Sequence, residues 1–102
     1  KTPEWRWRAY KARAKRIGIA FDLTMDTFKT FWRKPCWYCG SDIETIGLDR
    51  VENSKGYLSG NIVSCCEACN RAKLDFSQKD YLDRCRRIAK LHPEPDAEGV
   101  SC

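Results

Sequence analysis

The alternation of apolar and polar positions predicts two helices and a short strand in the first third of the chain. Apolar residues recur three and four positions apart over 5–17, which is the spacing of one face of an α-helix, and basic residues fill the other faces. Gly18 ends this helix, and apolar residues then alternate over 19–23 as in a half-buried strand. Thr24 is placed to cap a second helix over 25–33, which a Lys-Pro pair ends.

The remainder of the chain predicts the order strand, loop, strand, helix, followed by a longer helix. Short strands are expected over 46–51 and 61–64, on either side of a turn rich in Asn, Ser and Gly, and a short helix over 67–74. Ser77 begins a Ser-x-x-Asp capping box, and the last helix runs from there to residue 92. We expect its apolar side to be buried, with Cys85 as a small core residue. The residues on that side are Tyr81, Leu82, Cys85, Ile88 and Ala89.

Length and charge limit the class of protein. A chain of 102 residues is long enough for one domain with a modest apolar core, which a metal or disulfides would help to stabilise. No apolar run approaches the roughly 18 residues that cross a bilayer, and no secretory signal pattern opens the sequence, so we expect a soluble, cytoplasmic protein. The formal net charge is +5, and basic residues crowd into the first and last helices, which favours a polyanionic partner.

The seven cysteines include two Cys-x-x-Cys pairs, Cys36 with Cys39 and Cys66 with Cys69. An odd count without a secretory signal favours metal over disulfides, and the two pairs predict one tetrahedral zinc site. Four protein ligands leave no open coordination position, so this zinc is expected to be structural. Cys65 competes with Cys66 for one ligand position, and the spacing favours Cys66.

Several motifs follow one another in a fixed order. They are Cys36-x-x-Cys39, Leu48-Asp49-Arg50, Asn61, and Cys66-x-x-Cys69 followed at once by Asn70-Arg71-Ala72-Lys73. In this order they resemble the HNH, or ββα-metal, endonucleases, and the match covers about 35–74. The resemblance implies a small α+β fold with a zinc-bound ββα-metal core. The segment before the core resembles small phage and mobile-element HNH proteins, so a phage-infected or bacterial cell is the expected setting.

The resemblance also implies a second metal site. Asp49 and Asn70 match the protein ligands of a single catalytic divalent ion, Mg²⁺ or Mn²⁺, which takes hard oxygen donors. Asn61 matches the central Asn that fixes the loop between the strands by side-chain to backbone hydrogen bonds. Arg71 and Lys73 are expected to contact the phosphate backbone of DNA.

Arg50 departs from the family pattern, in which the residue after the metal-binding Asp is usually the histidine that activates water. A guanidinium stays protonated, so we expect Arg50 to hold the scissile phosphate instead. A subset of the family, including a rare-cutting restriction endonuclease, resembles this chain in having Asp-Arg followed by Gly-Tyr, and there a tyrosine is held to initiate cleavage. Tyr57 is therefore the leading candidate base. Glu52 is an alternative, although strand alternation places it away from Asp49, and the only histidine, His92, lies at the end of the last helix.

Two functions follow from these residues. The first is a DNA endonuclease whose catalytic residues are Asp49, Arg50, Tyr57 and Asn70. The second, in which Arg50 marks a loss of activity, is a catalytically inactive zinc-bound DNA-binding or assembly module. In both, basic residues of the first helix bind the DNA backbone with strong salt dependence. They are Arg6, Arg8, Lys11, Arg13, Lys15 and Arg16.

The chain is predicted to form a single HNH-type domain over 1–92. Its parts are the basic helical segment 1–34, the zinc and ββα-metal core 35–76 and the last helix 77–92. The Pro-containing tail 93–102 is expected to be mobile. One active site cuts one strand, so double-strand cleavage would need a homodimer or two encounters.

Overall fold

The computed structural model of the chain describes residues 2–95. The elements are α1 (Pro3–Ile17), α2 (Met25–Lys29), β1 (Leu48–Arg50), β2 (Ile62–Ser64), α3 (Glu67–Lys73) and α4 (Gln78–Leu91). β1 and β2 pair antiparallel, with Asp49 opposite Val63. The predicted order strand, loop, strand, helix is confirmed. Of the predicted tail 93–102, residues 96–102 lie outside the described part of the chain.

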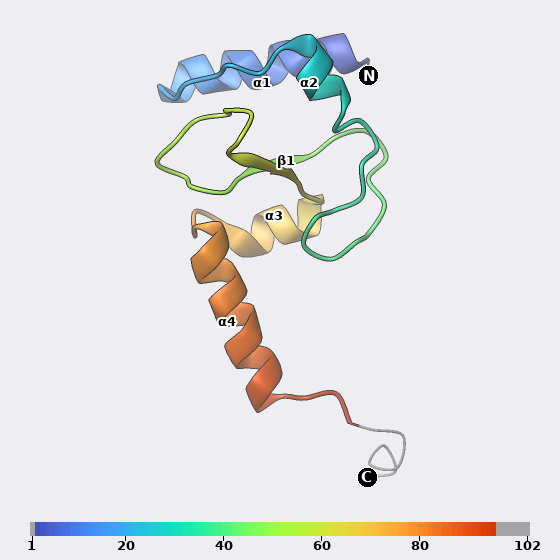
Figure 1. The fold of residues 1–102 in the computed structure, drawn as a ribbon, viewed down its shortest axis with the longest axis vertical. Helices are drawn as coiled ribbons and strands as arrows, with labels where there is room; N and C mark the ends of the chain where they lie inside the picture. The colour runs from blue at the N-terminus through green and yellow to red at the C-terminus, as the bar shows by residue number, and fades with distance from the viewer. Residues whose placement is uncertain (1, 96–102) are drawn as a thin grey trace.

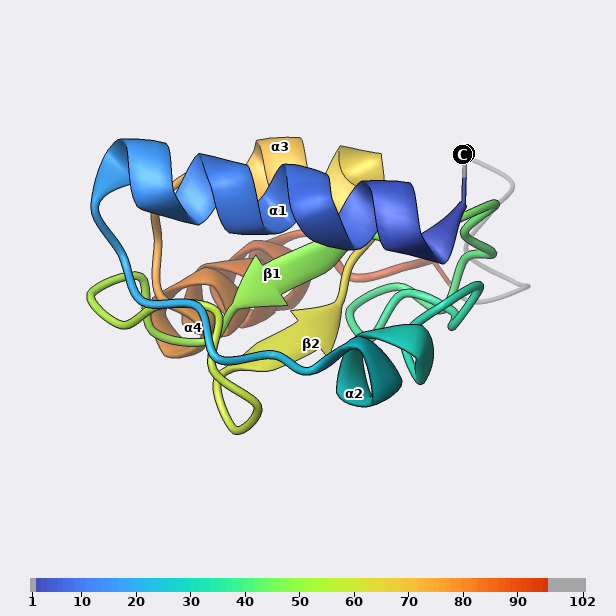
Figure 2. The ribbon, with the colours of Figure 1, turned by 90° about the horizontal axis from the view of Figure 1, so that it is seen from above.

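The strand pair lies between two helical layers (Figure 1). α1 and α2 cover one side of it, α3 lies on the other, and α4 extends from the end of α3 away from the rest of the molecule. Figure 2 shows α1 running across the strands, with α3 behind it. None of the helices within residues 2–95 is long and apolar enough to span a membrane.

The apolar core lies between α1 and the strand pair. Its buried members are Ala14, Leu23, Phe28, Ile46, Leu48, Tyr57 and Ile62. Trp7 and Tyr10 pack against this core from the face of α1 that the apolar spacing predicted. The Trp7 indole Nε1 also donates a hydrogen bond to the carbonyl oxygen of Leu23, at 2.8 Å, which joins α1 to the segment that leads into α2.

Three local predictions of caps are confirmed. Thr24 accepts a hydrogen bond from Thr27 N at the start of α2, and Ser77 accepts one from Asp80 N at the start of α4. Gly18 ends α1 with a left-handed φ of +78°, a conformation that favours glycine.

Two predictions in the segment between α1 and β1 are wrong. No strand forms over 19–23, because the pairing there is limited to one isolated bridge, between Phe21 and Tyr57. The second helix ends at Lys29 rather than continuing to Arg33. The residues after it form three-residue turns, and Arg33 adopts a left-handed φ of +58°.

The predicted burial of the apolar side of α4 is also wrong. No residue of α4 is buried, Cys85 is half-buried, and Ile88 is 54% exposed. Tyr81, in the first turn of the helix, contacts the zinc-binding segment, where its ring and that of Tyr38 pack edge to face with centroids 5.4 Å apart. The helix keeps its amphipathic pattern, but no other described element covers its far half.

Candidate functional site

The four cysteines of the two Cys-x-x-Cys pairs form one cluster. The Sγ atoms of Cys36, Cys39, Cys66 and Cys69 all lie within 4.8 Å of one another, and those of Cys39 and Cys66 are 3.7 Å apart. A tetrahedral Zn²⁺ with Zn–S bonds of about 2.3 Å separates its sulfur ligands by about 3.8 Å. Gly40, with a φ of +76°, follows the first Cys-x-x-Cys pair and lets the chain reverse there. The second pair lies at the start of α3, with Cys66 as its N-cap. The cluster therefore fits a structural zinc.

Cys66 rather than Cys65 belongs to the cluster, as the spacing predicted. The Cys66 sulfur accepts a hydrogen bond from Cys69 N at 3.4 Å, and this contact lowers the pKa of the Cys66 thiol to about 6. Cys65 is buried, and its thiol donates to the carbonyl oxygen of Cys66. Burial, together with the nearby charge of Asp49, raises the pKa of the Cys65 thiol to about 12.

A second site is a polar cavity of about 120 Å³ between α1, β1 and α3. Its lining residues are Tyr10, Arg13, Leu48, Asp49, Arg50, Asn53, Tyr57, Asn70 and Leu74. All four residues that the sequence assigned to catalysis, Asp49, Arg50, Tyr57 and Asn70, are among them. The fold thus brings together residues from β1, the loop after it and α3.

Asp49 is buried and both of its carboxylate oxygens have partners. The Tyr38 hydroxyl donates to Oδ2 at 2.6 Å, and the Lys73 ammonium lies 3.0 Å from Oδ1. Burial, followed by the bond to Asp49, raises the pKa of the Tyr38 hydroxyl above its usual range, so it remains a donor.

Lys73 corrects one prediction. Its side chain is fully buried, where it pairs with Asp49 and donates to the carbonyl oxygen of Arg50 at 3.2 Å, so it is not a phosphate contact. The reason is helical geometry: Lys73 lies three residues after Asn70 in α3, on the same face, and that face packs on β1.

The donor set of the cavity suits a hard divalent cation. Asp49 offers carboxylate oxygens and Asn70 an amide oxygen, and both residues line the cavity. Each carboxylate oxygen has two lone pairs, so the bonds from Tyr38 and Lys73 leave acceptor capacity on Asp49. Mg²⁺ or Mn²⁺ is the kind of ion that these residues fit.

The loop between β1 and β2 is fixed by Asn61. Its Oδ1 accepts a hydrogen bond from Glu52 N at 2.9 Å, and its Nδ2 donates to the carbonyl oxygens of Glu52 and Gly56 at 3.1 and 2.8 Å. These are the side-chain to backbone bonds expected of this residue. The Glu52 side chain itself is exposed and does not line the cavity, so it is poorly placed to act as the base.

The same loop is also joined to the segment after α1. Tyr57 N donates to Ala20 O at 2.9 Å, and Asp22 N donates to Tyr57 O at 3.2 Å. A Cβ atom at Gly56 would overlap the carbonyl oxygen of Ala20, so only glycine allows this approach. The position of Tyr57 therefore depends on residues far outside the motif that contains it.

Tyr57 is packed in aromatic and cationic surroundings. It is 5% exposed, its ring meets that of Tyr10 edge to face at 5.4 Å, and the guanidinium carbon of Arg50 lies 5.6 Å from its centroid. Arg50 Nη1 also donates to the carbonyl oxygens of Asn53 and Lys55, at 2.8 and 3.3 Å. Arg50 thus stabilises the loop in addition to lining the cavity.

The basic residues of α1 divide between two faces. Arg13 is exposed and lines the cavity, whereas Arg8, Lys11 and Lys15 line a hollow on the opposite side of the helix. Arg6 is half-buried, and it donates to the carbonyl oxygen of Ile46 at 3.0 Å.

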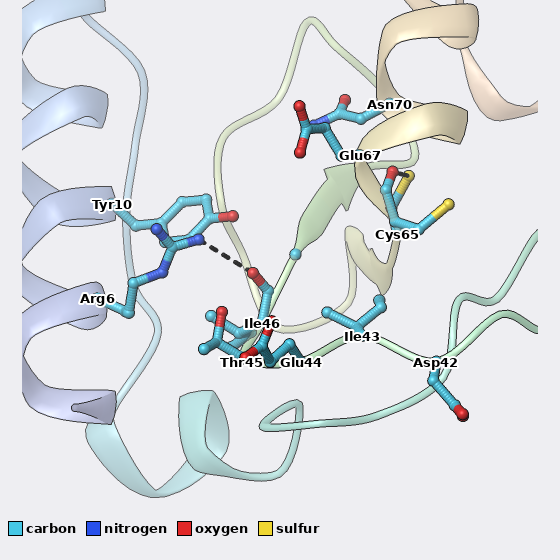
Figure 3. A pocket seen from close by; sticks show the side chains of 12 residues that line it. Arg6, Tyr10, Asp42, Ile43, Glu44, Thr45, Ile46, Cys65, Glu67 and Asn70 are labelled. Carbon is cyan, nitrogen blue, oxygen red and sulfur yellow. Dashed lines mark hydrogen bonds between the residues drawn. The ribbon is translucent and has the colours of Figure 1, made fainter. Parts of the chain in front are cut away.

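A larger cleft of about 520 Å³ continues from the cavity along α1. Figure 3 shows Arg6 and Tyr10 entering this cleft from α1, with Arg6 hydrogen-bonded to Ile46, and Asn70 and Glu67 on the far side, from α3. Tyr10 and Asn70 line both spaces, so the cleft and the cavity adjoin each other; we refer to the two together as the groove between α1 and α3. Arg71, on α3, is exposed and pairs with Glu67.

Sequence reasoning missed three residues that line the cavity: Tyr10, Asn53 and Leu74. The apolar spacing over 5–17 places Tyr10 on the core face of the first helix, and its position three residues before Arg13 is the signal that also places it beside the cavity. Its hydroxyl accepts a hydrogen bond from Leu48 N at 3.2 Å, and burial raises its pKa. Leu74 has a left-handed φ of +51° and is 70% exposed, features that no local sequence signal indicates.

Comparisons with known proteins show relatives in viruses and a similar solved fold. The chain is 41% identical over 86 residues to an uncharacterised protein of Acanthamoeba polyphaga mimivirus; the match covers 81% of the chain and 16% of that relative. It is 26% identical over 81 residues to an uncharacterised 29.0 kDa protein of Enterobacteria phage T4, encoded in the dda-modA intergenic region, with 72% of the chain and 33% of the relative covered. The chain thus spans a third or less of the length of these curated relatives. No protein-family model matches it.

The similar structure is that of PacI, a rare-cutting HNH restriction endonuclease for which an extraordinary mechanism of DNA perturbation is described. The two structures agree with a TM-score of 0.69 over 88% of this chain and 78% of PacI, at 24% sequence identity. Together with the four-cysteine cluster, this likeness confirms the predicted α+β class and its ββα-metal core.

Proposed function

We propose that this domain is a divalent-metal-dependent endonuclease that hydrolyses DNA phosphodiester bonds. The observation that carries the proposal is the convergence of Asp49, Arg50, Tyr57 and Asn70 on one cavity of about 120 Å³. The likeness to the endonuclease PacI supports the same class of reaction. Both curated relatives are viral, which supports a setting in infected cells.

Asp49 and Asn70 would hold the divalent ion. When bound, Mg²⁺ or Mn²⁺ stabilises negative charge on the scissile phosphate and on the departing 3′ oxygen. The burial of Asp49 and its hydrogen bond from Tyr38 keep the carboxylate in one orientation toward the cavity.

Tyr57 acts as the phenolate: its phenolic oxygen accepts the proton of the attacking water and Tyr57 becomes the neutral phenol. The Arg50 guanidinium, 5.6 Å from the ring centroid, stabilises negative charge on that ring and is near enough to the cavity to hold a phosphate oxygen. As the water oxygen bonds to phosphorus, the bond from phosphorus to the 3′ oxygen breaks.

DNA binds in the groove between α1 and α3. Arg13 lies in the wall of the cavity and is exposed, so it is the residue of α1 best placed to contact a phosphate beside the scissile one. Arg8, Lys11 and Lys15 lie on the opposite face of α1 and contribute longer-range attraction only.

The second candidate is a catalytically inactive DNA-binding or assembly module. Two observations favour it. Both carboxylate oxygens of Asp49 already have partners, and the Tyr57 side chain is only 5% exposed. In this alternative the four-cysteine cluster and the groove remain, and no bond is cleaved.

A plasmid-nicking assay with Mg²⁺ or Mn²⁺ over pH 6 to 9 separates the two functions. The endonuclease proposal expects nicking by the parent, loss of nicking in Asp49→Asn and Tyr57→Phe, and retained nicking in Tyr10→Phe, which tests the other tyrosine of the cavity. Asp49→Asn is preferred to alanine because it keeps the shape of the side chain beside Lys73.

Absence of metal-dependent nicking by the parent at every pH, with salt-dependent DNA retention, would establish the inactive module. Nicking that persists in Tyr57→Phe and disappears in Tyr10→Phe would move the role of base to Tyr10.

A further inference from the structure

The zinc-binding segment reaches the candidate ion site through a partly buried hydrogen bond from Tyr38 to Asp49. We propose that Tyr38 is a positioning residue that sets the affinity for the divalent ion by orienting Asp49. This inference rests on the proposed function, because it assigns a role toward the ion that Asp49 would hold.

The position of Tyr38 follows from the fold of the cysteine cluster. Tyr38 lies between Cys36 and Cys39, whose sulfur atoms belong to the cluster, so a bound zinc fixes its backbone. Its ring packs edge to face against Tyr81 at 5.4 Å, and its hydroxyl donates to Asp49 Oδ2 at 2.6 Å. The hydroxyl is therefore held at a fixed place relative to the carboxylate.

The two partners of Asp49 act on an incoming cation in opposite ways. The Tyr38 hydroxyl directs the carboxylate lone pairs without adding charge, as hydrogen bonds to metal ligands generally do. The Lys73 ammonium, 3.0 Å from Oδ1, adds a positive charge that opposes a divalent ion. Without the hydroxyl, the side-chain partner that Asp49 keeps within residues 2–95 is this competing ammonium, so the affinity for the ion falls.

The structure offers a matched pair of substitutions. Tyr38→Phe removes the hydroxyl that bonds Asp49. Tyr81→Phe removes a hydroxyl that lies near Cys85 and Cys69 instead of Asp49, so it controls for an effect transmitted through the zinc cluster. Because loss of a hydrogen bond to a metal ligand typically weakens metal binding about 10-fold to 100-fold, Tyr38→Phe should bind Mn²⁺ at least about 10-fold more weakly than the parent, and Tyr81→Phe should bind it as the parent does.

The experiment is titration of the zinc-loaded chain with Mn²⁺, followed by calorimetry and by the electron paramagnetic resonance signal of free Mn²⁺. Zinc content and circular dichroism are measured on the same samples, because a positioning role leaves both unchanged. Replacing Tyr38 with p-aminophenylalanine restores a donor at the same place and should recover Mn²⁺ affinity, which also covers the case in which Tyr38→Phe folds poorly.

Parent-like Mn²⁺ affinity in folded Tyr38→Phe would overturn this inference while leaving the proposed function intact. The Asp49→Asn variant distinguishes a failure of the role of Tyr38 from a failure of the proposed ion site. If Asp49→Asn binds Mn²⁺ as well as the parent, or if the parent binds none, the ion site of the proposed function fails and the role of Tyr38 fails with it.

Discussion

Replacing Lys73 with methionine tests how much the buried ion pair between Lys73 and Asp49 contributes to the stability of the domain. The Lys73 side chain is fully buried, Asp49 is 5% exposed, and their charged atoms are 3.0 Å apart. Removing one member of a buried pair typically costs about 3–5 kcal/mol, because the other charge remains without compensation. Asp49 keeps its hydrogen bond from Tyr38 and borders a polar cavity, so we expect the lower end of this range, about 3 kcal/mol.

The assay is urea unfolding of the zinc-loaded protein, followed by tryptophan fluorescence, with Arg71→Met as the control. Arg71 is on the same helix and also forms an ion pair, with Glu67, but both side chains are more than three-quarters exposed, so its loss should change little. The double variant Asp49→Asn with Lys73→Met should recover much of the lost stability, because no buried charge is then unpaired. A Lys73→Met variant as stable as Arg71→Met, or a double variant no more stable than Lys73→Met, would refute this account of the pair.

Three further predictions concern the loop, the cysteine cluster and α3. Gly56→Ala should lower the unfolding free energy and abolish nicking while zinc remains bound, because the added Cβ overlaps the segment that holds Tyr57; parent-like nicking would show that the contact is dispensable. Cys66→Ser should lose zinc, measured by metal analysis of the purified protein, whereas Cys65→Ser should retain it; equal loss in both would contradict the ligand assignment. Leu74→Gly should raise the melting temperature, since it relieves a left-handed φ that costs on the order of 1 kcal/mol and exposes no buried surface; an unchanged or lower value would show that this conformation is not strained.

Local chemistry explains which elements the sequence predicted. Thr24 and Ser77 cap their helices through bonds that span three residues, and the Cys-x-x-Cys spacing selected Cys66 over Cys65 for the same reason. Such short-range geometry depends on the residue types and their separation alone, so it can be read before the fold is known.

The errors concern partners that are distant in sequence. The family resemblance assigns Lys73 to DNA, but its side chain is buried against Asp49, which lies on a different element, and a lysine is fully buried almost only when it is paired. The hydrogen bond from Tyr38 to Asp49 likewise depends on how the cysteine cluster packs against β1. The apolar pattern of α4 predicted burial, yet amphipathicity shows that a helix has an apolar side, not that another element of the domain covers it.

The backbone pairing of Ala20 and Asp22 with Tyr57 bears on how such a domain can be inherited. A segment that starts at Pro35 carries all four zinc ligands together with Asp49 and Asn70, so by motif alone it looks transferable. It would arrive in a new host protein without the strand-like stretch that positions Tyr57 and without the helix that forms one wall of the groove. A unit that recombination moves with this geometry intact therefore includes α1, which starts some thirty residues before the first recognisable motif.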